Sequence, residues 1–355
     1  VASLLPREWD LKVADLTAGE LTEDDWSQCD AVMVTGMVNQ GSGMFETIKE
    51  GKRRGKMVVA GGPLVFHLPD DSLSPWVDII VRGEAEEIAA SLVSAMKRRE
   101  RGVVIRATNW PDMSASPPPR YDLLDMGLYT DMVVQFSRGC PFLCEFCDIT
   151  LMFGRKVRTK APEQILAELQ ILYDLGWRRA VFFVDDNFIG STNRAKELLR
   201  KLIPWMEDRG HPFDFMTQAS VNLGKDDELL DLMARAGFHS VFLGIESTDK
   251  KSLILTKKFQ NAATDLDLAC QKINSAGLKV VAGCIIGFDN EEPGADQRLI
   301  DFANRNQIPE MFVTMLQAGP GTGLFKRLQA EGRVGVLELT DHLGSQTGLI
   351  NFEPS

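Results

Sequence analysis

The stretch from Ser137 to Cys147 constrains this chain more than any other part of the sequence. Its three cysteines, Cys140, Cys144 and Cys147, have the spacing C-x-x-x-C-x-x-C and follow a strand-like run at 132–136. Three thiolates from one loop can converge on a small volume, and iron–sulfur clusters are held by cysteine thiolates, four for a cubane. Three ligands would leave one iron of a cubane open to another molecule. The spacing therefore predicts a metal-cluster loop.

Zinc and plain structural cysteines are the two alternatives. Structural zinc sites are closed by four ligands, and no fourth Cys or His lies near the loop in sequence. Half of the six cysteines fall within eight residues, amid glycine, proline and charge, which argues against three structural cysteines. The other cysteines, Cys29, Cys270 and Cys284, have no partner spacing. We expect them to be structural, because free cysteines are among the most buried residues.

Length and charge limit the classes of protein to consider. The 355 residues leave room for two domains. A net charge of −11 argues against a nucleic-acid partner, which would favour a basic face. No apolar run approaches the roughly 18 residues of a membrane span, and no signal peptide is visible. Clustered cysteines without a secretory signal predict a reducing cytoplasm. Residue 1 is Val, so we expect an N-terminal piece, including a first strand, to be missing.

Residues 1–102 have the alternating pattern of a doubly wound, Rossmann-like α/β domain. We expect strands at 11–16, 31–37, 57–60 and 77–81, and helices at 43–54 and up to about 98. In such sheets ligands bind beyond the carboxyl ends of the strands. Those ends are rich in glycine, which indicates either tight turns or close approach of a flat ligand: Thr35-Gly36-Met37, Gly61-Gly62-Pro63 and Gly83-Glu84.

Residues 103–130 form a proline-rich linker, and a second alternation begins at 131. Six strand–helix units predict a partial (β/α)6 barrel over 131–306, with the last strand and a truncated C-terminal extension in 307–355. The tail at 344–352 is polar and irregular. The expected strands are 132–136, 180–184, 213–218, 240–245, 279–286 and 311–316, and the helices are 162–175, 193–208, 226–236, 262–276 and 295–305.

Polar side chains recur where four successive barrel strands end. Asp and Asn are good helix N-caps, so capping is the alternative for Asp185 and Asn187. Recurrence on the side of the cysteine loop favours a ligand site. The basic run Arg155, Lys156, Arg158 and Lys160 reads as a solvated loop, apart from Arg158. The polar positions at the strand ends are Asp185, Asp186, Asn187, Gln218, Ser220, Glu246, Ser247 and Asp289.

The cysteine loop resembles that of the radical SAM superfamily, C-x-x-x-C-x-Φ-C, in which the aromatic position is here Phe146. The resemblance implies a 4Fe-4S cluster on the three cysteines, whose fourth iron chelates S-adenosylmethionine (SAM), and reductive cleavage of SAM to a 5′-deoxyadenosyl radical. It implies that Asp186 contacts the methionine amino group, that Phe146 and Gly287 lie near adenine, and that Glu246 lies near SAM. With the polar strand ends, the expected SAM site is Phe146, Asp186, Gln218, Ser220, Glu246 and Gly287.

The N-terminal segment resembles the cobalamin-binding domain that precedes many radical SAM cores, including its G-G-P and G-E-A-E signatures. The D-x-H-x-x-G motif for a lower histidine ligand is absent. We therefore expect cobalamin to bind without one, with Thr35, Met37 or Asn39 near its lower face. The remaining residues of the expected cobalamin site are Gly36, Gly61, Gly62, Pro63, Gly83 and Glu84.

Nearly the whole chain resembles the hopanoid C-2 methylase group of cobalamin-dependent radical SAM proteins, through F-F-V-D-D-N-F-I-G at 182–190 and through Phe213, Phe215 and Met216. The resemblance implies a methyltransferase acting on a small-molecule or lipid substrate and reduced by an electron donor such as flavodoxin or ferredoxin. Two alternatives stay open. One is a radical SAM enzyme that catalyses a non-methyl transfer or rearrangement without cobalamin, and the other is a non-catalytic cobalamin- or metal-binding protein.

Overall fold

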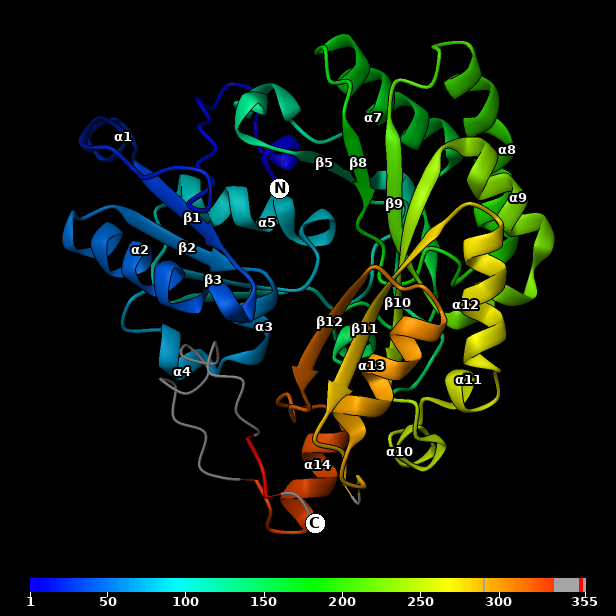
Figure 1. Cartoon of the computed structure of the whole chain (residues 1–355). Helices are drawn as coiled ribbons and strands as arrows, with labels where there is room; N and C mark the ends of the chain where they lie inside the picture. The colour runs from blue at the N-terminus through cyan, green and yellow to red at the C-terminus, as the bar shows by residue number, and fades with distance from the viewer. Residues whose placement is uncertain (290, 335–350, 354–355) are drawn as a thin grey trace. The chain divides into compact units, whose positions relative to one another are not determined.

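The computed structural model describes residues 1–289, 291–334 and 351–353 (Figure 1). They form two compact units, the first spanning Val1–Tyr129 and the second beginning at Thr130. Across these residues, no helix is both long and apolar enough to cross a lipid bilayer. Most of the expected tail, 344–350, lies outside the described residues. Asn351 exchanges two hydrogen bonds with the backbone of Ala318, at 2.8 and 3.0 Å, which attaches residues 351–353 to the second unit.

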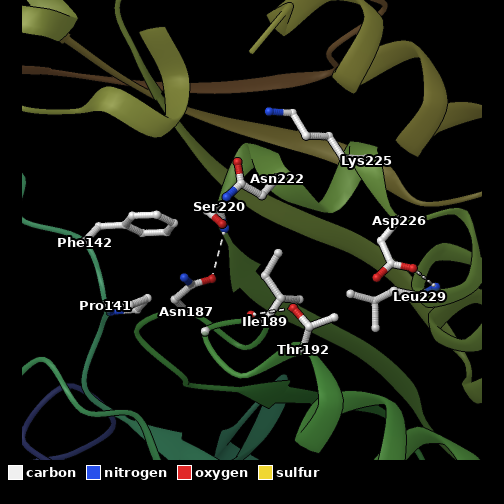
Figure 2. A pocket seen from close by; sticks show the side chains of 11 residues that line it. Pro141, Phe142, Asn187, Ile189, Thr192, Ser220, Asn222, Lys225, Asp226 and Leu229 are labelled. Carbon is white, nitrogen blue, oxygen red and sulfur yellow. Dashed lines mark hydrogen bonds between the residues drawn. The ribbon is translucent and has the colours of Figure 1, made fainter. Parts of the chain in front are cut away.

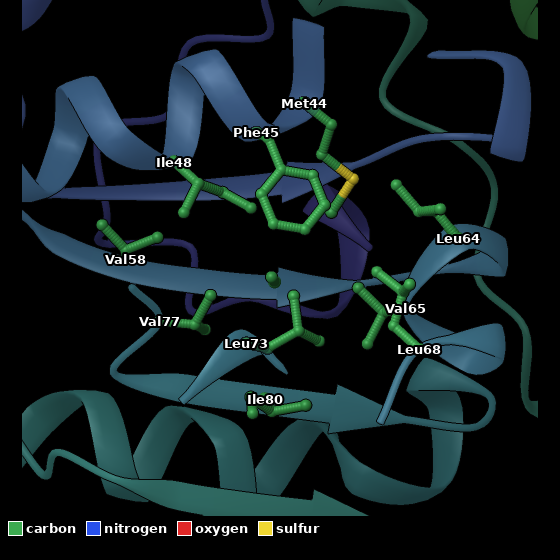
Figure 3. Close-up of a cluster of buried hydrophobic side chains, with 11 residues drawn as sticks. Met44, Phe45, Ile48, Val58, Leu64, Val65, Leu68, Leu73, Val77 and Ile80 are labelled. Carbon is green, nitrogen blue, oxygen red and sulfur yellow. The ribbon is translucent and has the colours of Figure 1, made fainter. Parts of the chain in front are cut away.

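The first unit is a parallel four-stranded sheet in the order β1-β2-β3-β4. Helices cover both faces of this sheet. Alternate residues of β2 point to opposite sides, so each face carries apolar side chains that a helix can bury. Val58 and Ala60 pack against α2, α3 and α4 (Figure 3), whereas Val59 packs on the other face against α5. The elements are α1 (Glu23–Gln28), β1 (Ala31–Thr35), α2 (Gly41–Arg53), β2 (Met57–Gly61), α3 (Pro63–His67), α4 (Asp70–Leu73), β3 (Ile79–Arg82), α5 (Ala85–Lys97) and β4 (Val103–Arg106).

Two expectations for this unit are corrected. The predicted strand at 11–16 is irregular, and its apolar side chains Val13 and Leu16 are exposed. The segment has the residue pattern of a strand but pairs with no strand among the described residues. The range expected as a linker begins with β4, which pairs with β3 from Ile79↔Val103 to Arg82↔Arg106. The sheet thus continues beyond residue 102, because β4 completes the hydrogen bonds of β3.

The second unit contains a six-stranded parallel sheet in the order β12-β11-β10-β9-β8-β5, which confirms the predicted barrel strands. In the described residues β5 and β12 are its two edges, so the barrel is open. A short antiparallel pair, β6 (Ser137–Arg138) and β7 (Arg158–Thr159), encloses the cysteine loop. The six strands are β5 (Asp131–Val134), β8 (Ala180–Phe183), β9 (Asp214–Ala219), β10 (Phe238–Glu246), β11 (Lys279–Ile286) and β12 (Glu310–Met315).

Helices line one side of this sheet, as Figure 1 shows for α7, α8, α9 and α12. Val181 and Phe183 of β8 are fully buried on that side, where Phe183 packs edge-on against Phe188 and Phe215. The opposite face is more open, with Val133 and Phe312 about half exposed. The helices are α6 (Ile149–Met152), α7 (Pro162–Asp174), α8 (Thr192–Glu207), α9 (Asp227–Ala236), α10 (Lys250–Leu255), α11 (Phe259–Ala262), α12 (Leu266–Ser275), α13 (Ala295–Arg305) and α14 (Gly323–Ala330).

A substitution at Gly62 tests the packing at the end of β2. The backbone of Gly62 has φ 89° and ψ −171°, a region essentially restricted to glycine, and an added Cβ would collide with the Thr35 side chain. We expect Gly62→Ala to lower the free energy of unfolding by at least about 2 kcal/mol, measured by urea denaturation.

Gly55→Ala is the matched control, because Gly55 also has positive φ, 71°, but nothing within 4 Å of an added Cβ. It should cost only about 1–2 kcal/mol, the intrinsic penalty of a left-handed residue. Equal losses in the two variants would contradict the packing argument.

Candidate functional site

The carboxyl ends of four adjacent strands, β8 to β11, bring the predicted SAM residues to one edge of the second sheet. Asp186 follows β8, Gln218 lies in β9 and Glu246 ends β10. Ser220 and Gly287 directly follow β9 and β11, and Phe146 belongs to the loop after β6. The expected set is therefore assembled along a single edge.

The cysteine loop leaves β6 through a backbone conformation that only glycine tolerates well. Gly139 has φ 90°, and a Cβ there would lie 2.9 Å from the carbonyl oxygen of Gly154. The next residue, Cys140, donates its N–H to the same carbonyl at 3.3 Å. Cys140, Cys144 and Cys147 are all free and partly buried. The loop thus presents three thiols from a fixed starting point.

Two carboxylates after β8 hold the start of this loop. Buried Asp185 accepts hydrogen bonds from the backbone N–H groups of Phe136 and Ser137 and from the Ser137 hydroxyl. Asp186 accepts from the Gly139 N–H at 3.1 Å. Asn187 accepts from the Ser220 N–H at 3.1 Å. The capping alternative for Asp185 and Asn187 is therefore wrong, since both side chains bond to other segments and α8 begins only at Thr192.

Glu145 holds the other side of the loop. Its N–H donates to the carbonyl of Thr256 at 2.8 Å, and its own carbonyl accepts from Leu324 N–H at 2.8 Å. The buried carboxylate pairs with Arg327 of α14 at 3.1 Å and with Lys257 at 3.4 Å. These contacts fix the segment between Cys144 and Phe146 to the region after β10 and to α14.

A buried ion pair joins Glu246 to Lys258, a residue that the sequence did not single out. Glu246 has φ 63°, unusual for a non-glycine residue, and follows a register shift between Gly244 and Glu246 in the pairing of β10 with β11. The Asn261 side chain donates to the carbonyls of Gly244 and Ile245, at 2.8 and 3.0 Å. A Cβ on Gly244 would collide with the ion pair, which explains why residue 244 is a glycine.

Lys258 links the predicted SAM residues to the cysteines. Its ammonium nitrogen lies 5.9 Å from the centre of the Phe146 ring. Desolvation lowers the pKa of Lys258, but the negative charge of Glu246 raises it, and deprotonated Cys144 and Cys147 would raise it further. No spacing rule distinguishes Lys258 from its exposed neighbour Lys257, so sequence reasoning missed it.

Gln260 is a second missed residue. Its side-chain N–H lies 3.4 Å from the sulfur of Cys144. Hydrogen bonds to the sulfurs are among the factors that set the potential of iron–sulfur clusters. The residues after β10 thus supply both a cation and a donor near the cysteines.

Desolvation raises the pKa of the Cys147 thiol to about 12 and also raises that of Cys140. Bare thiolates are therefore unfavourable in this loop, and a bound metal would have to replace the protons. Among the described residues, no three Cys, His, Asp or Glu side chains are placed to hold one metal ion. A cubane binds each thiolate at a different iron, so the partly buried thiols fit such a cluster better than the zinc alternative.

A pocket of about 400 Å³ lies where the loop meets the ends of β8 and β9 (Figure 2). Pro141 and Phe142 line one side, and Asn187, Ser220 and Asn222 line another. Of the predicted SAM residues, Ser220 alone is among its lining residues. Gly287 instead donates its N–H to Glu291 at 2.6 Å. Apart from Ser220, the predicted SAM residues therefore share the edge but do not line this pocket.

The predicted cobalamin residues lie at the carboxyl ends of β1, β2 and β3. Thr35, Met37, Asn39, Gly62 and Gly83 are exposed there. A Cβ on Gly83, at φ 99°, would lie 2.5 Å from the Ala107 Cβ. Contacts within the protein thus explain why residues 62 and 83 are glycines, without reference to a ligand. The other predicted positions are Gly36 and Glu84, which are buried, and Gly61 and Pro63, which are partly buried.

The basic run after the loop is not uniformly solvated. Lys160 is buried and forms a salt bridge with Glu168 at 2.5 Å. Arg155 and Arg158 donate to the carbonyls of Pro141 and Phe153, at 3.3 and 3.1 Å. The expectation of a solvated loop is therefore wrong for Lys160, whose charge is compensated inside the protein.

Asp185 makes stability depend on pH. Burial raises the pKa of its carboxyl to about 7, although the hydrogen bonds from Ser137 and Phe136 lower it. The folded protein then retains a proton that the unfolded chain releases above about pH 4. Stability should fall as pH rises from about 4 to 7, and Asp185→Asn should remove most of this fall, of the order of a few kcal/mol. Urea unfolding at several pH values measures it.

Asp208→Asn is the control for this profile, because Asp208 is exposed at the end of α8. It should keep the wild-type pH dependence. A pH profile of Asp185→Asn that matches the wild type would contradict the assignment.

The Glu246–Lys258 pair predicts that replacing Lys258 costs much more unfolding free energy than replacing the adjacent Lys257. Lys258→Met would leave the Glu246 charge buried without its partner, which should cost about 3–5 kcal/mol of unfolding free energy. Lys257→Met should cost only about 1 kcal/mol or less, because Lys257 is 52% exposed and its partner Glu145 keeps the ion pair with Arg327. Adding Glu246→Gln to Lys258→Met should recover part of the loss in urea unfolding. Additive losses would contradict the pairing.

Comparison with known proteins identifies the family. Residues 134–303 match the Radical SAM superfamily model. The chain is 47% identical over its whole length to an uncharacterized methyltransferase of Synechocystis sp., covering 66% of that protein. It is 36% identical over 94% of its length to the hopanoid C-2 methylase of Rhodopseudomonas palustris, covering 64% of that protein. The chain thus spans about two thirds of the length of these relatives.

The fold is also shared with solved structures. One is the radical S-adenosylmethionine methyltransferase TsrM from Kitasatospora setae, with cobalamin and a [4Fe-4S] cluster bound, at a TM-score of 0.71 and 16% identity. That match covers 88% of this chain and 67% of TsrM. The cysteine loop, the open six-stranded barrel and the family match agree, and the chain belongs to the radical SAM superfamily.

Proposed function

We propose that this protein is a cobalamin-dependent radical SAM methyltransferase that methylates an unactivated carbon of a small-molecule or lipid substrate. The observation that carries the proposal is the loop of Cys140, Cys144 and Cys147, held between Asp185 and Glu145 at the edge where the predicted SAM residues gather. When bound, the cluster supplies an electron for the cleavage of SAM, and cobalamin supplies the methyl group.

Within this proposal the residues of the chain bind and orient the cofactors and exclude water from them. Asp186 and Glu246 offer carboxylates beside the cysteine loop, and Phe146 offers an aromatic face next to Lys258. We propose that these three residues, with Gln218, Ser220 and Gly287, hold SAM. The exposed ends of β1, β2 and β3, including Thr35, would hold cobalamin.

The open face of the second sheet supports an apolar substrate. Phe242 and Phe312 lie on adjoining parts of this face, with ring centres 6.0 Å apart, and Phe312 is half exposed. Gly283 fits beneath Phe242, because a Cβ there would approach its ring within 2.5 Å. A small apolar molecule or lipid matches this aromatic surface. All six cysteines are free, which suits a reducing cytoplasm.

Anaerobic reconstitution tests the proposal. The full-length protein, treated with iron, sulfide and hydroxocobalamin and then desalted, should retain about four irons, as a cubane requires, and about one cobalt per chain. With reductant and SAM it should form 5′-deoxyadenosine. Cys140→Ala, Cys144→Ala and Cys147→Ala should each lose most of the cluster absorbance and SAM cleavage.

Cys29→Ala is the matched control, since Cys29 lies in the first unit and its thiol donates to the Trp26 carbonyl at 3.7 Å. It should keep the cluster. Iron without cobalt in the full-length protein would refute the cobalamin assignment and favour the radical SAM enzyme that works without it. Cobalt without iron would favour the non-catalytic alternative.

A further inference from the structure

A lysine-rich, apolar surface lies directly outside the cysteine loop. We define the α10–α11 face as Lys250, Lys251, Ile254, Leu255 and Phe259. The three apolar side chains are unusually exposed, Ile254 and Leu255 at 48% and Phe259 at 56%. Such exposed apolar clusters rimmed by charge are typical of sites that bind another protein.

The helix geometry explains why these side chains share a face. Lys250 and Ile254, and Lys251 and Leu255, are each four residues apart, so both pairs lie on the same side of α10. Ser252 and Leu253 point the other way and are buried. α10 packs against α11, which begins at Phe259. The face therefore combines lysines with an apolar centre.

The α10–α11 face is basic, although the protein as a whole is acidic. The chain carries a net charge of −11, yet the segment 250–262 contains four lysines and no acidic residue. Lys257 and Lys258 pair with Glu145 and Glu246, whereas Lys250 and Lys251 are exposed. An acidic partner would be repelled by the chain as a whole and steered toward this segment.

The face also lies close to Cys144, one of the predicted cluster ligands. Phe259 precedes Gln260, whose amide lies 3.4 Å from the Cys144 sulfur. Thr256, at the end of α10, accepts the N–H of Glu145 in the cysteine loop. Electron transfer slows steeply with distance, so a donor seated here would have a short route to the cluster.

We propose that the α10–α11 face is the docking site of an acidic one-electron donor protein of the flavodoxin or ferredoxin type. This inference rests on the proposed function, which requires a reductant for the cluster. In each encounter the donor is oxidised by one electron and the cluster is reduced by that electron, with no bond made or broken in the chain. The lysines steer the donor, and Ile254, Leu255 and Phe259 form the apolar contact.

Cluster reduction by a flavodoxin tests the proposal. The reconstituted full-length protein is mixed anaerobically with reduced flavodoxin, and the loss of cluster absorbance gives a second-order rate constant. We expect Lys250→Glu/Lys251→Glu to lower this constant at least tenfold at low salt and to flatten its dependence on ionic strength. Reduction by photoreduced 5-deazaflavin, which needs no docking, and the iron content should be unchanged.

Lys201→Glu/Lys279→Glu is the matched control, with the same change in net charge at two exposed lysines on α8 and at the start of β11. It should change the flavodoxin rate by less than about threefold, because its charges lie outside the face. Phe259→Ser should weaken the apolar contact and lower the rate even at high salt. Equal losses in both double variants, or no loss in Lys250→Glu/Lys251→Glu, would overturn the proposal.

Flavodoxin binding to the metal-free full-length chain, measured by calorimetry, separates this proposal from the proposed function. Binding that is lost in Lys250→Glu/Lys251→Glu supports the docking site even where no cluster forms, and binding that this variant retains overturns it. Vesicles containing phosphatidylglycerol test the competing occupant, an anionic membrane. Loss of vesicle binding in the variant, with flavodoxin-driven reduction retained, would assign the face to the membrane and overturn the proposal.

Discussion

The buried ion pair between Glu246 and Lys258 is the interaction on which the surroundings of the cysteine loop depend. Removing two charges from water costs several kcal/mol per ion, and the cost is offset only when the geometry is held. The bulge after Gly244, the positive φ of Glu246 and the two hydrogen bonds from Asn261 all serve that geometry. A fixed cation is thereby kept beside Phe146 and two of the cysteines.

The cysteine loop has almost no regular structure of its own, and its rigidity comes from its neighbours. Asp185 and Asp186 bind the backbone before Cys140, and Thr256 and Leu324 bind the backbone of Glu145. Buried backbone groups need partners, and here different strand ends and helices supply them. A ligand loop supported in this way keeps its thiols in place before any metal binds.

Sequence reasoning found the strands, their common edge and the three cysteines because these depend on local patterns. It failed where a distant partner decides the outcome. Asp185 looked like a possible helix cap, yet it bonds to Phe136, 49 positions away. Lys257 and Lys258 are chemically identical neighbours, and only the position of Glu246 makes one of them buried. The run 11–16 had a strand pattern but no strand beside it.

Polar and apolar side chains occupy different parts of the second sheet. Carboxylates and amides gather where the strands end, while the open face carries Phe242, Phe312 and Val133. An apolar surface beside charged groups lowers the local dielectric constant and strengthens their interactions. Under the proposed function, this arrangement would place a polar cofactor at the edge and an apolar substrate against the adjoining face.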